Sequence, residues 1–187
     1  MKHKLFCTLG LMVLALVGFA ANPAGAATAA GPYYANPSWD QTLPSDARFI
    51  VLSNMGGNAV LDRETGLVWE RSPSAEPETW FLATGACEPL SKGGRLGWRL
   101  PTIQELASLL VDPGVPVDPN FPGPTLPAGH PFSNVQSGYW SATTVTNIPN
   151  AAWLVNFGGI ATGVSLGLKT GTLPVWCVRG GQGVDTQ

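Results

Sequence analysis

The sequence predicts an α+β domain with a mainly antiparallel sheet, and the distribution of its apolar residues supports this fold class. Short apolar runs of strand type recur at 49–52, 59–62, 67–70, 139–144, 152–157, 161–168 and 174–179. Only two segments have helical character, a short one from Trp80 to Cys87 and a clearer one over 102–111. The strand-type runs are separated by turns and long loops instead of alternating regularly with helices, which is typical of α+β architecture.

Two of these elements have their own local signals. The runs 59–62 and 67–70 flank a four-residue segment that ends in Gly66, whose backbone freedom suits the tight turn of a β-hairpin. Thr102 and Glu105 form a capping box, in which each side chain accepts a backbone N–H at the start of the helix. A one-sided apolar stripe with helical spacing then follows, made by Ile103, Leu106, Leu109 and Leu110.

The N-terminus has the layout of a secretory signal peptide. A basic start at residues 2–4 precedes an almost unbroken apolar run from Leu5 to Ala20, and Ala24-Gly25-Ala26 fits a small-residue cleavage site. A membrane anchor is the alternative, but a span needs about 20 apolar residues and this run is shorter. We expect a signal peptide over 1–26 and a secreted or periplasmic protein without a membrane span after cleavage.

The remaining chain divides into an arm, one domain and a short tail. Residues 27–47 are rich in Ala, Pro and Tyr and are interpreted as a linker or loosely docked arm, followed by a domain over 48–181 and a tail over 182–187. The leader contains two of the ten basic side chains, so eight remain against twelve carboxylates, a net charge of −4. This balance argues against nucleic acid as a partner, because binding a phosphate backbone requires a basic excess.

Two cysteines remain once the leader, which carries Cys7, is removed. Cys87 and Cys177 form an even pair in an oxidising compartment, which predicts a disulfide between them. Two buried free thiols are the alternative. Their wide separation excludes a CxxC redox or zinc motif.

Residues 112–137 contain seven prolines and form a long loop, a kind of segment that is often functional. Asp112, Asp118 and Asn120 offer oxygen ligands at short spacing, so calcium binding is weighed against simple turn formation by Asp-Pro. No other cofactor is expected. His130 is weighed as a general base against turn packing, and no nucleophile with an orienting carboxylate accompanies it. We therefore expect a protein that is not an enzyme.

Aromatic and cationic side chains of the domain are interpreted mainly as structural. Five tryptophans lie in or next to strand-type runs, and a glycan-stacking platform is weighed against burial in the core, with the core favoured; they are Trp69, Trp98, Trp140, Trp153 and Trp176. Arg99 is weighed as the partner of a carboxylate or of a ligand, with the structural role favoured, and for Arg179, close to Cys177, a partly buried ion pair is favoured over a ligand contact.

Five segments, in this order along the chain, resemble the secreted bacterial Lcl C-terminal domain family. They are Asp62-Arg63-Glu64-Thr65-Gly66-Leu67-Val68-Trp69-Glu70, Gly97-Trp98-Arg99-Leu100-Pro101-Thr102 with Glu105-Leu106, Tyr139-Trp140-Ser141-Ala142-Thr143, Ala152-Trp153-Leu154-Val155-Asn156-Phe157 and Trp176-Cys177-Val178-Arg179. The resemblance implies a fold related to C-type lectin-like domains and to the formylglycine-generating enzyme. From the best-known type of member, it also implies a surface adhesin that binds sulfated glycans.

The chain departs from both functional types that this resemblance implies. It has no Gly-X-Y repeat for the collagen-like stalk of the adhesins, and its net negative charge does not favour sulfated glycans unless a local basic patch exists. The enzyme needs a closely spaced cysteine pair that holds copper, and Cys87 and Cys177 do not match that spacing. An oxidase is therefore the least favoured interpretation.

These observations lead to one favoured function and one alternative. We expect a C-type lectin-like domain that acts as a secreted noncatalytic binding module for an extracellular or envelope ligand, either a glycan or a protein. Its candidate ligand-binding residues are Asp118, Asn120, His130 and Tyr139, and its candidate calcium ligands are Asp112, Asp118 and Asn120. The alternative is a structural or assembly component of the bacterial envelope that docks through residues 27–47.

Overall fold

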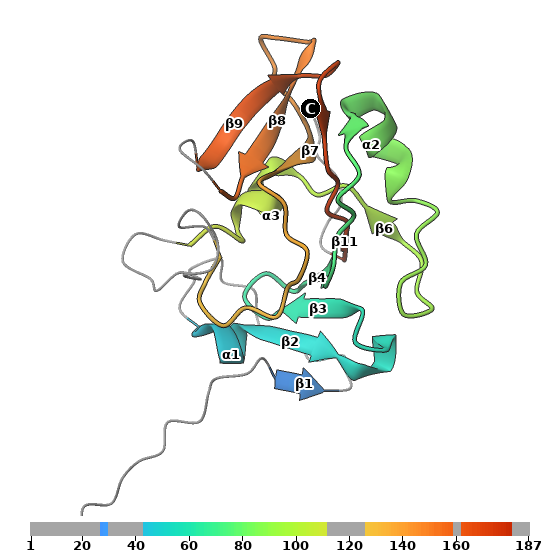
Figure 1. Cartoon of the computed structure of the whole chain (residues 1–187), viewed down its shortest axis with the longest axis vertical. Helices are drawn as coiled ribbons and strands as arrows, with labels where there is room; N and C mark the ends of the chain where they lie inside the picture. Colours follow the sequence, from blue (N-terminus) through green and yellow to red (C-terminus); the bar gives the residue numbers. More distant parts are fainter. Residues whose placement is uncertain (1–26, 30–42, 112–125, 159–161, 181–187) are drawn as a thin grey trace, which may run out of the picture.

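The structure, a computed structural model, describes residues 27–29, 43–111, 126–158 and 162–180. These residues form short helices and eleven strands arranged in three sheets (Figure 1). All strand pairs except one are antiparallel, the exception being the pair of β1 and β2. The predicted α+β class with mainly antiparallel pairing is confirmed.

The largest sheet has six strands in the order β1-β2-β3-β4-β11-β6. Their bounds are β1 Ala27–Ala29, β2 Phe49–Leu52, β3 Ala59–Asp62, β4 Leu67–Glu70, β11 Val178–Arg179 and β6 Trp98–Arg99. Strands β3 and β4 form the predicted hairpin, with Gly66 at a φ of 70° in its turn. The last described strand, β11, thus lies between β4 and β6, so the C-terminal part of the domain pairs with two of its earlier strands.

The other two sheets are smaller. One has three strands in the order β7-β8-β9, with bounds Gly138–Thr144, Ala151–Asn156 and Gly163–Leu168, and the other pairs β5 (Glu78–Thr79) with β10 (Thr172–Leu173). The predicted strand over 174–179 is therefore wrong in its first part, since only Val178–Arg179 pairs as a strand. Residues 174–177 bond elsewhere: the Trp140 amide donates to the Pro174 carbonyl, and the Cys177 amide donates to the Glu70 carboxylate.

The helices are short, namely α1 (Ser45–Arg48), α2 (Trp80–Ala86) and α3 (Ile103–Ala107), together with a 3-10 turn over Ser53–Met55. The capping box of α3 is present as predicted, but the helix ends at Ala107 instead of continuing to 111. The Ser108 hydroxyl donates to the Glu105 carbonyl, and the Ser108 carbonyl accepts from the Arg48 guanidinium. After Ala107 the chain continues in tighter turns, in which the Leu109 amide donates to the Leu106 carbonyl and the Leu110 amide to the Ala107 carbonyl.

The expected arm contains regular structure at both of its ends. Ala27–Ala29 forms β1, which pairs with β2, and Ser45–Arg48 forms α1. The predicted signal peptide over 1–26 and the tail over 182–187 lie outside the described residues. Within the described parts of the chain, no helix is long and apolar enough to cross a membrane.

A buried cluster of charges ties α1 to the β3–β4 hairpin. The Arg48 guanidinium donates to both carboxylate oxygens of Asp62, at 2.9 and 2.7 Å, and lies 3.5 Å from the Glu64 carboxylate. All three side chains are almost fully buried, and the second Glu64 oxygen accepts from the Leu43 amide. The Ser108 carbonyl also accepts from Arg48, so the cluster links α1, the hairpin and the end of α3.

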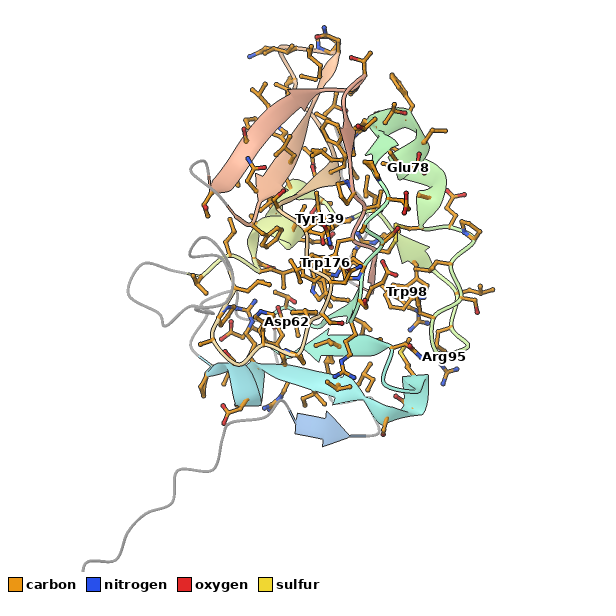
Figure 2. All side chains as sticks on the ribbon, in the orientation of Figure 1. Asp62, Glu78, Arg95, Trp98, Tyr139 and Trp176 are labelled. Carbon is orange, nitrogen blue, oxygen red and sulfur yellow. A yellow bond between two sulfur atoms is a disulfide. The ribbon has the colours of Figure 1, made fainter. Side chains whose placement is uncertain are left out.

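The core is organised around the indole of Trp176. Four aromatic rings surround it with centroids 5.0 to 5.8 Å away, namely Trp69, Phe132, Tyr139 and Phe157. Figure 2 shows Trp176 and Tyr139 in the middle of the molecule, between the six-stranded and three-stranded sheets. The core interpretation of the tryptophans is confirmed for Trp69, Trp98, Trp140 and Trp176, which are fully buried, while Trp153 is half-buried.

The predicted disulfide between Cys87 and Cys177 is present, with Cα atoms 5.6 Å apart. It connects the end of α2 to the residue before β11, and both cysteines are buried. The bridge therefore fixes the loop that follows α2 against the six-stranded sheet.

We expect loss of this bridge to destabilise the domain. In a Cys87→Ala/Cys177→Ala double variant, the free energy of unfolding should fall by about 2–5 kcal/mol, because the unfolded chain regains the freedom that the cross-link removes. Urea unfolding at equilibrium measures the change. The wild-type protein under reducing conditions is the control and should lose a similar amount. Equal stability of the oxidised wild type and the double variant would contradict a stabilising disulfide.

Candidate functional site

An open pocket of about 220 Å³ lies where four separate segments meet. It is lined by Gly57, Asn58, Arg71, Ser72, Lys92 and Ser133. The segments are the turn before β3, the residues after β4, the loop after α2 and the end of the proline-rich segment. We refer to it as the Arg71–Lys92 pocket.

Arg71 connects two walls of the pocket. Its Nε donates to the Pro131 carbonyl at 3.2 Å, and its Nη1 donates to the Gly57 carbonyl at 3.4 Å. The backbone of Arg71 contacts the same two walls: its amide donates to the Asn58 carbonyl, and its carbonyl accepts from the Ser133 amide. Within the described residues no carboxylate forms an ion pair with Arg71.

Lys92 provides the second cation, and its loop is placed by a close backbone approach. Gly93, with a φ of 58°, packs so tightly against Met55 that a Cβ at this position would overlap Met55. A glycine is therefore required beside Lys92, both for the left-handed backbone and for the contact. The Lys92 ammonium lies 3.4 Å from the Glu70 carboxylate and remains about one-third exposed, with a side-chain exposure of 34%.

Glu70 is the buried partner of this cation. Its side chain is only 4% exposed, one oxygen lies next to Lys92, and the other accepts from the Cys177 amide at 3.0 Å. Burial raises the pKa of the Glu70 carboxyl, and the Cys177 amide and the Lys92 charge only partly oppose this effect. The carboxylate therefore positions Lys92 at a cost in desolvation.

The lining suits recognition of an anion. Two cationic groups converge with the hydroxyls of Ser72 and Ser133, which can donate hydrogen bonds, and with Asn58, whose side-chain nitrogen donates to the Met55 and Gly56 carbonyls. A guanidinium binds carboxylate or sulfate oxygens in a fork geometry, and an ammonium adds a point charge.

Two of the residues predicted to bind ligand lie near the aromatic core. Tyr139 is fully buried, and its hydroxyl oxygen accepts from the Gln136 amide at 2.6 Å. Burial raises the pKa of the Tyr139 phenol, and in this position the side chain presents no surface to a ligand. His130 is half-buried with its ring 5.9 Å from that of Phe132, and its amide donates to Pro127, so it packs in a turn.

The predicted calcium ligands Asp112, Asp118 and Asn120 lie outside the described residues. Their role in binding calcium or ligand stays a prediction. In the described ranges, no three His, Cys, Asp or Glu side chains gather in a way that would hold a metal ion.

Two arginines singled out by the sequence have structural partners. Arg99 makes the expected ion pair, donating to both Glu105 oxygens at 2.7 and 2.6 Å. Arg179 was expected to form an ion pair, but its Nε donates to the Leu96 carbonyl at 2.8 Å instead, and within the described chain it has no carboxylate partner at ion-pair distance. The loop after α2 passes close to Arg179, so a backbone oxygen takes the place of a carboxylate.

Sequence reasoning missed the main residues of this pocket, namely Asn58, Arg71 and Lys92. A weak signal existed, because Asn58 follows the pair Gly56-Gly57 and Lys92 precedes the pair Gly93-Gly94. Paired glycines mark turns that bring backbone close to other groups. Nothing local indicates that the two turns meet at Arg71.

The fold and the pocket define a small, disulfide-linked α+β domain with a cationic site at the meeting point of its loops. The family model of the Lcl C-terminal domain matches residues 58–179, more than half of the chain, and the chain belongs to this family. The matched region holds five of the six pocket residues and both cysteines. No curated protein matches the sequence.

Burial of Glu70 predicts a specific pH dependence of stability. Because the native pKa is raised above the reference value of 4.5, the native state binds this proton more tightly than the unfolded state does. The resulting stabilisation is complete below that value and is lost as pH rises through the native pKa. We expect Glu70→Gln to remove this pH-dependent stabilisation. The difference in unfolding free energy between variant and wild type should therefore change as pH rises from the reference pKa to the native pKa of Glu70.

Urea unfolding at a series of pH values measures this difference. Glu76→Gln, at an exposed position, is the matched control and should keep the wild-type profile. A pH-independent difference between Glu70→Gln and wild type would contradict the raised pKa.

Proposed function

We propose that this protein is a secreted noncatalytic binding module that holds an anionic group of an extracellular or envelope ligand in the Arg71–Lys92 pocket. The observation that supports the proposal best is the convergence of two cations on one open pocket in a chain with an overall negative charge. An acidic glycan is the ligand class that we favour.

The remaining hydrogen-bond donors of the Arg71 guanidinium support an anionic ligand. Its hydrogen bonds to the protein use Nε and Nη1, and Nη2 has no partner within the described residues. A carboxylate or sulfate reaching Nη2 would form a charge-assisted hydrogen bond, the stronger kind of polar contact. Lys92 is already shared with Glu70, so it strengthens the local positive potential instead of acting as the principal contact.

The neutral part of the lining supports a ligand that also carries hydroxyl groups. Asn58, Ser72 and Ser133 combine donors and acceptors around the cations. Pockets for whole drug-sized ligands usually enclose about 300–1,000 Å³, so this smaller pocket suits one charged sugar unit with the rest of the ligand outside. Ser133 comes from the end of the proline-rich segment, the region that the sequence predicted to bind ligand.

Two further features are consistent with this role. The Cys87–Cys177 disulfide suits an oxidising compartment, as does the predicted signal peptide. We also propose the C-type lectin-like relationship that the family resemblance implies, with Asp112, Asp118 and Asn120 as calcium ligands in the loop. A chelator in the binding experiment below tests that calcium site.

A glycan-array screen of the purified, disulfide-bonded protein tests the proposal. We expect selective capture of uronate-, sialate- or sulfate-bearing glycans that persists at physiological salt. Arg71→Gln should weaken binding of the best glycan about tenfold or more, the loss expected for one charge-assisted hydrogen bond. Arg95→Gln removes the same charge from an exposed side chain outside the pocket and should bind almost as wild type.

Each alternative has its own outcome in the same experiment. Equal weakening by Arg71→Gln and Arg95→Gln would indicate nonspecific charge attraction and overturn the pocket. Loss of capture in a chelator would support calcium at Asp112, Asp118 and Asn120. A blank array with folded protein would favour the envelope-assembly alternative, in which deletion of residues 27–47 should abolish association with envelope components.

A further inference from the structure

The three-stranded sheet ends on an open edge at β9. In the order β7-β8-β9, β9 pairs with β8 on one side, and no described strand covers its other side. Figure 1 shows β9 on the outer side of this sheet, away from α2 and β11. An uncovered edge strand is a template for pairing with another strand.

The backbone groups available at this edge follow from the register of β8 and β9. Ala151 lies opposite Leu168, so Asn150 lies opposite Lys169, and the Lys169 amide donates to the Asn150 carbonyl at 2.8 Å. Successive residues of a strand direct their backbone groups to opposite sides. The N–H and C=O groups of Val164 and Leu166 therefore point away from β8, toward the open edge.

The side chains on one face of β9 are apolar and exposed. Val164, Leu166 and Leu168 have exposed fractions of 51%, 47% and 57%, and they alternate with Ser165 and Gly167. They form a continuous stripe along the edge, unlike the scattered apolar residues that are normal on a protein surface.

Charge is absent from the whole sheet. Residues 138–168, which contain all three of its strands, include no Asp, Glu, Lys or Arg. Proteins usually protect an edge strand with charged side chains or proline, and β9 has neither. The first charged residue after it, Lys169, is buried with its ammonium 4.1 Å from the centre of the Trp80 ring.

We propose that β9 is a self-association edge, at which a second copy of the chain pairs through its own β9. In antiparallel pairing about a twofold axis, Leu166 faces the partner subunit's Leu166, and Val164 faces the partner subunit's Leu168. The outward backbone groups then bond to their counterparts, and the two apolar stripes lie on the same face of one six-stranded sheet. The proposal does not depend on the ligand of the Arg71–Lys92 pocket.

A second copy fits this edge better than an unrelated peptide. The stripe is self-complementary, because its outer positions are equidistant from Leu166 and all three side chains are aliphatic. Two copies with net negative charge would repel each other at most surfaces, but not at a sheet without charges. Stable dimers bury about 1,200–2,000 Å², more than one pair of six-residue strands supplies, so we expect weak association with a Kd of about 10 μM to 1 mM.

Sedimentation velocity of the disulfide-bonded protein over a concentration series tests this pairing. The wild-type mass should rise from monomer toward dimer within about 10 μM to 1 mM. Leu166→Lys places two ammonium groups face to face at the axis and should weaken dimerisation at least about tenfold. Leu82→Lys changes an equally apolar side chain on α2, 62% exposed, and should dimerise as wild type.

A cross-linking variant provides a second readout that does not depend on the folding of Leu166→Lys. Hydrogen-bonded antiparallel pairs have Cα atoms about 5.5 Å apart, within the range that disulfides bridge. Under oxidising conditions Leu166→Cys should therefore form a covalent dimer, whereas Leu82→Cys should not. A wild-type mass that stays monomeric over the whole range would overturn the proposal. So would dimers equally weakened by both lysine variants, or equal cross-linking of both cysteine variants.

Discussion

The buried carboxylate of Glu70 connects the last strand, the disulfide and the pocket. Its oxygen accepts from the Cys177 amide, while the Glu70 amide donates to the Cys177 carbonyl and the Glu70 carbonyl accepts from the Trp176 indole. These bonds hold residues 174–177, which lie between β10 and β11 and belong to no strand, at the position where Trp176 enters the aromatic core. The same bonds hold Cys177 at the sheet, where its disulfide fixes the loop after α2.

The location of the cationic pocket follows from this arrangement. Glu70 ends β4, so the next residue, Arg71, leaves the sheet at the surface, and the Glu70 carboxylate attracts Lys92 from the loop that the disulfide anchors. A buried carboxylate is costly, because desolvation disfavours its charge and raises its pKa. Here the Cys177 amide and the Lys92 ammonium offset part of that cost, and the second contact holds Lys92 near the strand end from which Arg71 leaves the sheet.

Many elements of the fold could be predicted because their signals are local. The β3–β4 hairpin needs only two short apolar runs and Gly66, and the start of α3 needs only Thr102 and Glu105, which lie within one turn of each other. The C-terminal end of α3 was predicted too far along the chain, because the residues after Ala107 form tighter turns, and there the Ser108 carbonyl accepts from Arg48, 60 positions away. Periodicity describes neighbours along the chain and contains no information about such a contact.

The candidate site also combines features that the sequence predicts with features that only the packing decides. Composition and cysteine number were enough to predict the disulfide and the tryptophan core, because burial of large rings and pairing of two cysteines in an oxidising compartment are general tendencies. The pocket was not predictable, because Arg71 and Lys92 become neighbours only when the loop after α2 folds back on β4. Tyr139 was predicted to bind ligand, yet packing against Trp176 buries its side chain. The sequence by itself determined the locally signalled elements, such as the β3–β4 hairpin and the start of α3, and the covalent closure, whereas long-range packing decided where several elements end and which polar groups meet at the surface.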